Sequence, residues 1–205
     1  MIKLENELEV LLISDPLTSK CAASINVGVG SFSDHINTQG LAHLTEHLIF
    51  LGSKEFPTAG ELDSHLQSHS GYTNAFTDSE NTAYYFEVNP SGYERALEIF
   101  SSMFDSPLLD EKHMDKEINA VNSENNKNLN SDTWRQHQLI NSLANSDSPL
   151  SLFSTGNNQT LRQLDTQLLN KKIKEYFNRY YVPFNMKLVL LCKLVFIIQY
   201  FDYFD

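Results

Sequence analysis

The chain has 205 residues, of which 41% are hydrophobic and 20% are charged, and its 15 basic and 26 acidic side chains give a net charge of −11. This length allows one sizeable hydrophobic core, and the composition is that of a soluble globular protein. The negative charge repels phosphate backbones and anionic lipid surfaces, which argues against a nucleic-acid-binding or membrane-surface protein. We therefore expect neither nucleic acid nor a membrane among its partners.

Three features indicate the cellular compartment. The N-terminus carries Lys3 and Glu5 and has no apolar stretch, unlike a signal peptide. The apolar run at 188–198 contains Lys193 and is shorter than the roughly 20 residues of a membrane span. Cys21 and Cys192 are expected to be free, buried thiols in a reducing compartment. The sequence thus predicts a cytoplasmic protein.

The first elements expected along the chain are two strands and two helices. An apolar run at 8–13 ends in the turn sequence Ser14-Asp15-Pro16, and apolar residues alternate over 22–29, so both segments predict strands. The apolar stretch 41–51 predicts a helix. Thr58 and Glu61 have the spacing of a capping box, which predicts the start of a second helix.

A hairpin and further helices follow. Two β-rich segments flank 77–81, with alternating side chains in the second, and predict two paired strands. Asn89-Pro90 predicts the start of a helix over 93–104. Asp110 can cap the next helix. The same patterns predict helices at 134–143 and 168–180 and a strand at 187–192. Because strands and helices are mixed without regular alternation, we expect an α+β fold with a largely antiparallel sheet backed by helices.

The segment His43-Leu44-Thr45-Glu46-His47 carries the strongest functional pattern. On a helix, His43 and His47 lie one turn apart on the same face, so both imidazoles can reach one metal ion. Glu46 can lie beside that ion without binding it, where a general base for water belongs. His65 and His69 have the same spacing but no carboxylate between them, so we expect them to serve packing or to be exposed.

A catalytic zinc site needs a third protein ligand and an open fourth position. Glu124 is the candidate, and Glu117 lies almost two helical turns before it with Val121 between them. The shared face indicates that both carboxylates point toward the protein. The spacing alone leaves open the alternative that both simply face water.

The motif and its distance from Glu124 resemble those of the pitrilysin and insulysin family of zinc metallopeptidases. The segments that carry the resemblance most clearly are Glu46-His47-Leu48-Ile49-Phe50-Leu51-Gly52, Ser70-Gly71-Tyr72-Thr73-Asn74-Ala75-Phe76-Thr77 and Asn119-Ala120-Val121-Asn122-Ser123-Glu124. The resemblance covers roughly residues 3–192. It implies one zinc ion bound by His43, His47 and Glu124, with Glu46 as the general base and Glu117 as a supporting acid near the zinc.

The resemblance also implies a substrate site. Asn74-Ala75-Phe76 is similar to the family's edge strand, on which an extended peptide adds as a further strand. Phe50, Phe76 and Trp134 resemble an apolar pocket beside the scissile bond. From the residues alone, core packing of these three aromatic side chains is the competing explanation. His137 stands where the family has a phenylalanine, so the pocket is expected to differ here.

The resemblance implies a zinc metallopeptidase domain over 1–192, incomplete at its C-terminal end, followed by a divergent apolar tail at 193–205. The expected function is hydrolysis of short or unfolded peptides. The alternative is a truncated, non-catalytic module that binds zinc and peptide. A C-terminal half or a homologous subunit is an expected partner in either case. Asn6-Glu7 replaces the family's common Asn-Gly, so that turn is expected to be altered.

Overall fold

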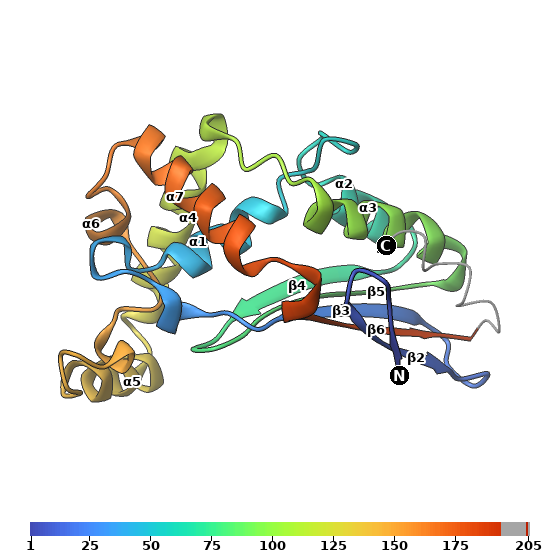
Figure 1. The fold of residues 1–205 in the computed structure, drawn as a ribbon, viewed down its shortest axis with the longest axis horizontal. Helices are drawn as coiled ribbons and strands as arrows, with labels where there is room; N and C mark the ends of the chain where they lie inside the picture. The colour runs from blue at the N-terminus through green and yellow to red at the C-terminus, as the bar shows by residue number, and fades with distance from the viewer. Residues whose placement is uncertain (194–203, 205) are drawn as a thin grey trace.

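The computed structural model describes residues 1–193 and Phe204, and a six-stranded sheet forms its base (Figure 1). The strands are β1 (Ile2–Lys3), β2 (Glu9–Ser14), β3 (Cys21–Val27), β4 (Tyr72–Thr77), β5 (Thr82–Val88) and β6 (Met186–Cys192). They lie in the order β1-β2-β6-β3-β5-β4, so β4 is an edge strand. Only β2 and β6 run parallel among these described pairs. The predicted largely antiparallel sheet is confirmed.

Two helices lie over one face of this sheet, and the others gather at or beyond one of its ends (Figure 1). They are α1 (Leu41–Ile49), α2 (Glu61–Ser68), α3 (Tyr93–Asp105), α4 (Glu111–Asn128), α5 (Asp132–Ser142), α6 (Asn158–Leu161) and α7 (Thr166–Tyr180). Short 3₁₀ turns occupy Ser31–Ser33, Ile36–Thr38, Pro90–Gly92, Pro149–Ser151 and Pro183–Asn185. In Figure 1, α2 and α3 lie above the strands, whereas α1, α4, α6 and α7 gather at the left end of the sheet. The α+β fold expected from the sequence is confirmed.

The core fills the space between the helices and the facing side of the sheet. Alternate residues of β3 and β6, including Ile25 and Leu190, are buried, as the two-residue period of a strand requires. Phe86 of β5 and Phe100 of α3 meet there with ring centroids 5.2 Å apart. Burying side chains of this size stabilises the fold by about 1.5–3 kcal/mol each.

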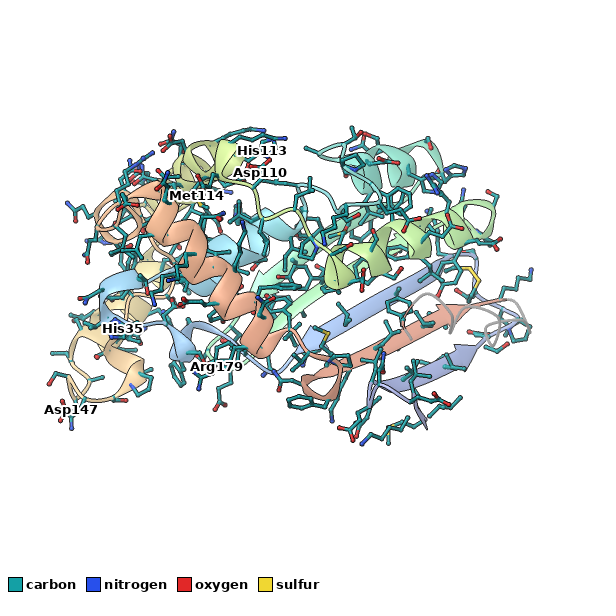
Figure 2. The ribbon with its side chains drawn as sticks, turned by 45° about the horizontal axis from the view of Figure 1, so that its top comes forward. His35, Asp110, His113, Met114, Asp147 and Arg179 are labelled. Atoms are coloured by element: carbon teal, nitrogen blue, oxygen red, sulfur yellow. A yellow bond between two sulfur atoms is a disulfide. The ribbon has the colours of Figure 1, made fainter. Side chains whose placement is uncertain are left out.

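Two of the three predicted helix starts are confirmed. The Asp110 carboxylate accepts the Lys112 backbone N–H at 3.2 Å and caps α4 (Figure 2), and Pro90 opens the 3₁₀ turn that leads into α3. The capping box at Thr58 and Glu61 is wrong. Gly60 precedes α2 with φ of 76°, and Thr58 contributes its backbone carbonyl to the Glu61 N–H rather than its side chain. A glycine in the left-handed conformation has replaced a side-chain cap.

The expectation of two free thiols is also wrong. Cys21 and Cys192 are both fully buried, as expected, but their sulfur atoms are joined in a disulfide. The register that pairs Ala22 of β3 with Leu191 of β6 sets the two cysteines opposite each other, with Cα atoms 4.2 Å apart. The covalent link therefore joins two neighbouring strands at one end of the sheet.

The remaining expectations concern the two ends of the chain. Glu7 has φ of 75°, so the Asn6-Glu7 turn adopts the left-handed conformation that glycine would favour. That conformation costs a non-glycine residue roughly 1–2 kcal/mol. Most of the tail predicted at 193–205 lies outside the described residues. Within the described residues, no helix is both long enough and apolar enough to cross a membrane.

Candidate functional site

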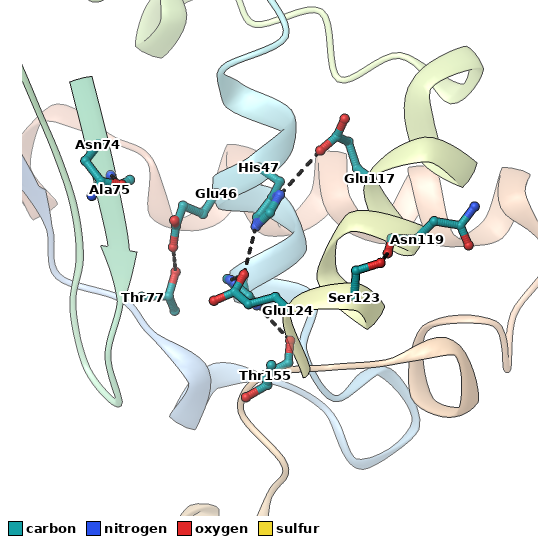
Figure 3. Close-up of polar contacts among 11 residues, drawn as sticks. Glu46, His47, Asn74, Ala75, Thr77, Glu117, Asn119, Ser123, Glu124 and Thr155 are labelled. Carbon is teal, nitrogen blue, oxygen red and sulfur yellow. Dashed lines mark hydrogen bonds and ion pairs between the residues drawn. The ribbon is translucent and has the colours of Figure 1, made fainter. Parts of the chain in front are cut away.

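Helix α1 lies between the edge strand β4 and helix α4 and presents two histidines toward α4 (Figure 3). The rings of His43 and His47 lie 4.9 Å apart between centroids, as expected for residues one helical turn apart. Leu44 and Leu48 on the same helix are completely buried and anchor it to the core. The predicted pair is therefore held on a rigid, well-packed helix.

Helix α4 brings Glu124 to these histidines. Its Oε2 atom lies 3.4 Å from His43 Nε2 and 3.7 Å from His47 Nε2. One potential ligand atom of each of the three residues lies within 4.8 Å of the others. The structure thus brings together the three side chains expected to bind a metal, from two different helices.

The other ring nitrogen of each histidine has its own partner. His43 Nδ1 lies 2.8 Å from the Thr155 carbonyl oxygen, and His47 Nδ1 lies 3.3 Å from Glu117 Oε2. A carbonyl or carboxylate oxygen only accepts, so each Nδ1 donates and each Nε2 is left toward Glu124. Glu117 is only 8% exposed. The alternative that this acid faces water is therefore wrong.

Glu46 lies on the other side of α1, facing β4. It is buried, and its Oε2 accepts a hydrogen bond from Thr77 Oγ1 at 2.5 Å. Figure 3 shows this carboxylate directed toward the strand, away from Glu117. Thr77 therefore fixes the carboxylate in the space between the histidines and the edge strand.

The charges of the site are strongly coupled. Burial would lower the pKa of His47, but hydrogen bonds to Glu117 and Glu124 outweigh it and raise the pKa to about 9. Burial would also lower the pKa of His43. Its hydrogen bonds to Glu124 and to the Thr155 carbonyl outweigh this effect, so the pKa of His43 is raised. The same two histidines hold the pKa of Glu124 far below its usual value. Burial raises the pKa of Glu46, although the bond from Thr77 works against this.

The start of α1 is held by a buried acid and by backbone packing. Asp34 accepts the Gly40 N–H at 2.7 Å and the Ala42 N–H at 2.9 Å through its two carboxylate oxygens. A Cβ atom on Gly40 would lie 2.3 Å from the Gly156 Cα atom, so only glycine allows this approach. The contact sets the segment before α1 against the segment that contains Thr155. It thereby places the Thr155 carbonyl at His43.

The side chains expected at the substrate site line one pocket together with the histidines and glutamates described above. The pocket has a volume of about 540 Å³, and these side chains are Phe50, Asn74, Ala75, Phe76 and Trp134. Phe76 is 52% exposed and Trp134 is 45% exposed, so core packing does not explain them. Phe50 is partly buried and also contacts Tyr84, with ring centroids 5.8 Å apart. The pocket therefore extends from the histidines along the edge strand.

His65 and His69 lie apart from this site. His65 Nε2 lies 2.8 Å from the Gly92 carbonyl oxygen, and His69 Nδ1 lies 2.9 Å from the His65 carbonyl oxygen. These contacts fit the predicted packing role at the junction of α2 and α3.

Sequence reasoning missed three residues that organise the site: Asp34, Thr77 as the partner of Glu46, and Thr155. Thr155 acts through its backbone carbonyl, which carries no signal in a sequence. Asp34 precedes the helix it caps by several residues, outside the usual capping position. Thr77 lies at the end of the segment Asn74-Ala75-Phe76-Thr77, so the sequence placed it near the site. Nothing in the sequence indicated that its hydroxyl group would donate to Glu46.

Comparisons with known proteins agree with this geometry. Residues 9–147 match the model of the family described as insulinase, peptidase family M16. The A-factor-processing enzyme of Saccharomyces cerevisiae is 46% identical over 93% of this chain and 19% of its own length, and human insulin-degrading enzyme is 41% identical over 94% and 19%. A Schizosaccharomyces pombe protein, mug138, which is named as a zinc protease, is 44% identical over 93% of this chain and 20% of its own.

The fold is similar to a crystal structure of pitrilysin, with a TM-score of 0.91 and 34% identity, over 97% of this chain and 21% of that one. The chain thus spans about a fifth of the length of the relatives that it matches. The family match extends over more than half of the chain and includes the helix with both histidines and the helix with Glu124. The chain therefore belongs to the insulinase family of peptidases, peptidase family M16.

Proposed function

We propose that the chain carries the zinc-binding and water-activating part of a metalloendopeptidase that hydrolyses short or unfolded peptides. The observation that carries the proposal is the convergence of His43, His47 and Glu124 beside an exposed edge strand, with Glu46 between them and the strand. The names of the relatives, which include a zinc protease, an A-factor-processing enzyme and an insulin-degrading enzyme, support the same assignment.

The donor set fits zinc. Two imidazole nitrogens and one carboxylate oxygen are the ligands of many catalytic zinc sites, which keep a fourth position open. His43 and His47 each direct Nε2 toward Glu124 because Nδ1 is engaged by Thr155 or Glu117. Such outer partners orient a metal-binding imidazole and make it a better ligand. We assign His43, His47 and Glu124 as the ligands of one zinc ion.

When bound, zinc would supply a Lewis acid that lowers the pKa of water and polarises a peptide carbonyl. The protein's own contribution to the chemistry is proton transfer by Glu46. Its raised pKa brings the carboxylate closer to the operating pH, where a general base is most effective. Thr77 holds Oε2, which leaves the other carboxylate oxygen to take the proton from water and return it to the leaving amine. Burial of Glu46 keeps competing water away from this oxygen.

The edge strand β4 would bind the peptide. Among the described residues, β4 pairs with β5 alone, so its backbone can accept an added strand along its other side, next to α1. Asn74, Ala75 and Phe76 would align that strand, and Phe50 and Trp134 would contact its side chains within the 540 Å³ pocket. A binding module that does not hydrolyse peptides would use the same zinc ligands and edge strand. The observation that favours this alternative is that the chain spans only about a fifth of the length of its relatives.

Replacing Glu46 by glutamine tests the proposal. The amide cannot accept a proton, so peptide hydrolysis should fall by about 10²–10⁴-fold while zinc stays bound. The measurement is cleavage of a quenched fluorogenic peptide by the zinc-loaded chain mixed with the remaining part of a relative. Glu111→Gln on α4 is the matched control. Hydrolysis that is unchanged by Glu46→Gln would refute the assignment of the base.

Glu117 would act through His47 rather than on the substrate. Glu117→Gln should therefore lower zinc affinity by roughly 10–100-fold without abolishing binding. Competition with a chromophoric chelator measures this, and Glu111→Gln again controls for the lost charge. Wild-type affinity in Glu117→Gln would show that the contact at 3.3 Å with His47 has no role in metal binding.

Zinc binding should release protons in a pH-dependent way. Without metal, His47 has a pKa of about 9 against an ordinary value of 6.5, so near neutral pH it is protonated, and a metal ligand must lose that proton. His43, whose pKa is also raised, adds to this release, so at least one proton per zinc should leave near neutral pH, and the contribution of the histidines should disappear as pH rises above about 9. In the metal-free protein, the stabilisation from this raised pKa is present below 6.5 and is lost through about 9.

Calorimetric titrations of zinc in buffers with different ionisation enthalpies measure that number. Binding heats that do not depend on the buffer near neutral pH would contradict the prediction.

A further inference from the structure

A second pocket opens beside the site, at the end of β4. It has a volume of about 260 Å³ and lies between the β4–β5 turn, the first turn of α5 and the segment at Ser154. Thr77, Trp134 and Ser154 line both this pocket and the larger one at the histidines. The two pockets are therefore neighbours that share one wall.

Most of the residues that line this smaller pocket are of polar types, and one of them is an aspartate. Apart from Trp134, the lining consists of serine and threonine residues, His137 and Asp78. Among the described residues, no lysine or arginine lines the pocket. The net charge of −11 gives the protein a negative electrostatic potential, which adds to that of the Asp78 carboxylate. The pocket therefore favours a cationic group over an anionic one.

The backbone of the turn holds Asp78 in place. Its N–H donates to the Asn81 carbonyl at 2.8 Å, and its carbonyl accepts the Ser31 N–H at 2.9 Å. The carboxylate Oδ1 accepts the Ser79 N–H at 2.7 Å. Oδ2 has no hydrogen-bond partner among the described residues, so it can pair with a ligand.

Trp134 provides an aromatic wall of the same pocket. It is 45% exposed, and its ring lies edge-on to that of His137 with centroids 6.2 Å apart. A guanidinium or ammonium group is attracted by an indole face, and arginine also stacks on it. An apolar side chain, by contrast, would remove water from the surrounding hydroxyl groups without replacing their hydrogen bonds.

Strand β4 links the two pockets to one substrate. Its residues Asn74 to Thr77 border the larger pocket, and Thr77 borders the smaller one together with Asp78 and Ser79 of the turn that follows. An extended peptide along β4 would pass the histidines first and the smaller pocket next. We propose that the smaller pocket binds an arginine or lysine side chain of the peptide, with Asp78 and Trp134 as the residues that select it. This inference rests on the proposed function, since it assumes that peptides bind along β4.

The test uses the zinc-loaded Glu46→Gln chain, which should bind peptides without cutting them. Trp134 is the only tryptophan in the sequence and lines both pockets, so its fluorescence reports on peptides bound along either of them, and the position of the arginine distinguishes the two. The probes are short, acetylated and amidated peptides in which a single arginine is moved along an otherwise neutral sequence. Each is paired with a peptide that has citrulline, a neutral residue of the same shape, at that position. At one position, arginine should bind about 5–20-fold more tightly than citrulline.

Two charge-removing variants locate the effect. Asp78→Asn keeps an oxygen for the Ser79 N–H and should reduce the arginine preference by about threefold, leaving the part that Trp134 contributes. Glu80→Gln removes a charge from the same turn, at a residue that does not line the pocket, and should keep the preference. Equal binding of arginine and citrulline peptides at every position would overturn the inference, as would a preference that Asp78→Asn leaves unchanged. Peptides that bind nowhere on the zinc-loaded chain would instead overturn the proposed function.

Discussion

Replacing Glu124 by glutamine is expected to lower zinc affinity by more than about 100-fold. This is a larger loss than is typical when a residue that only hydrogen-bonds to a metal ligand is replaced. A neutral amide is a poor substitute for an anionic ligand. The carboxylate also lies within 3.4 Å and 3.7 Å of the two histidine Nε2 atoms, so its charge draws all three donors together. Competition with a chelator measures the affinity. Glu111→Gln, on the same helix but away from the site, should bind zinc like the unmodified chain.

An unchanged zinc affinity in Glu124→Gln would remove this residue from the site. Folding of the variant is checked by its far-ultraviolet circular dichroism and thermal unfolding. Because the side chain is 45% exposed, its loss should affect metal binding far more than the core.

The second large effect concerns turnover. The chain alone is expected to bind zinc but to cleave peptides slowly, and adding the remaining part of a relative should raise the rate by about 100-fold or more. A peptide on β4 would be held by one wall of the pocket, against the entropy cost of ordering it. In proteins about five times longer, further parts are available to close over the peptide and exclude water.

The assay is cleavage of a quenched fluorogenic peptide, with Glu46→Gln as the blank in both mixtures. Fast, Glu46-dependent cleavage by the 205-residue chain, with no gain from the added part, would contradict this prediction. The catalytic unit would then be complete within this chain.

Local patterns were sufficient to predict most of the elements and part of the site. Apolar alternation located β3 and β5, and the spacing of His43 and His47 put both imidazoles on one face of α1. These patterns repeat within a few residues, so short-range sterics and burial decide them. The role of Glu124 could not be predicted from its spacing, which did not exclude that the side chain simply faces water. The resemblance to a known family was needed to predict it as a metal ligand.

Other features depend on contacts between distant segments. The disulfide joins cysteines that are 171 residues apart, and their pairing follows from the register of β3 and β6. The Thr155 carbonyl reaches His43 only because Gly40 and Gly156 pack against each other. The predicted capping box of α2 was wrong for a local reason. Gly60, in the left-handed conformation, precedes the helix in place of a residue whose side chain caps it.

X-ray absorption at the zinc edge, combined with the zinc content of the purified chain, tests the central claim most directly. The account predicts about one zinc ion per chain, with two imidazole nitrogens and one carboxylate oxygen at about 2.0–2.2 Å and a further light atom in the open position. Replacing His43 or His47 by alanine should remove the corresponding nitrogen. A chain that holds no zinc, or a zinc environment without histidine nitrogens, would contradict the account.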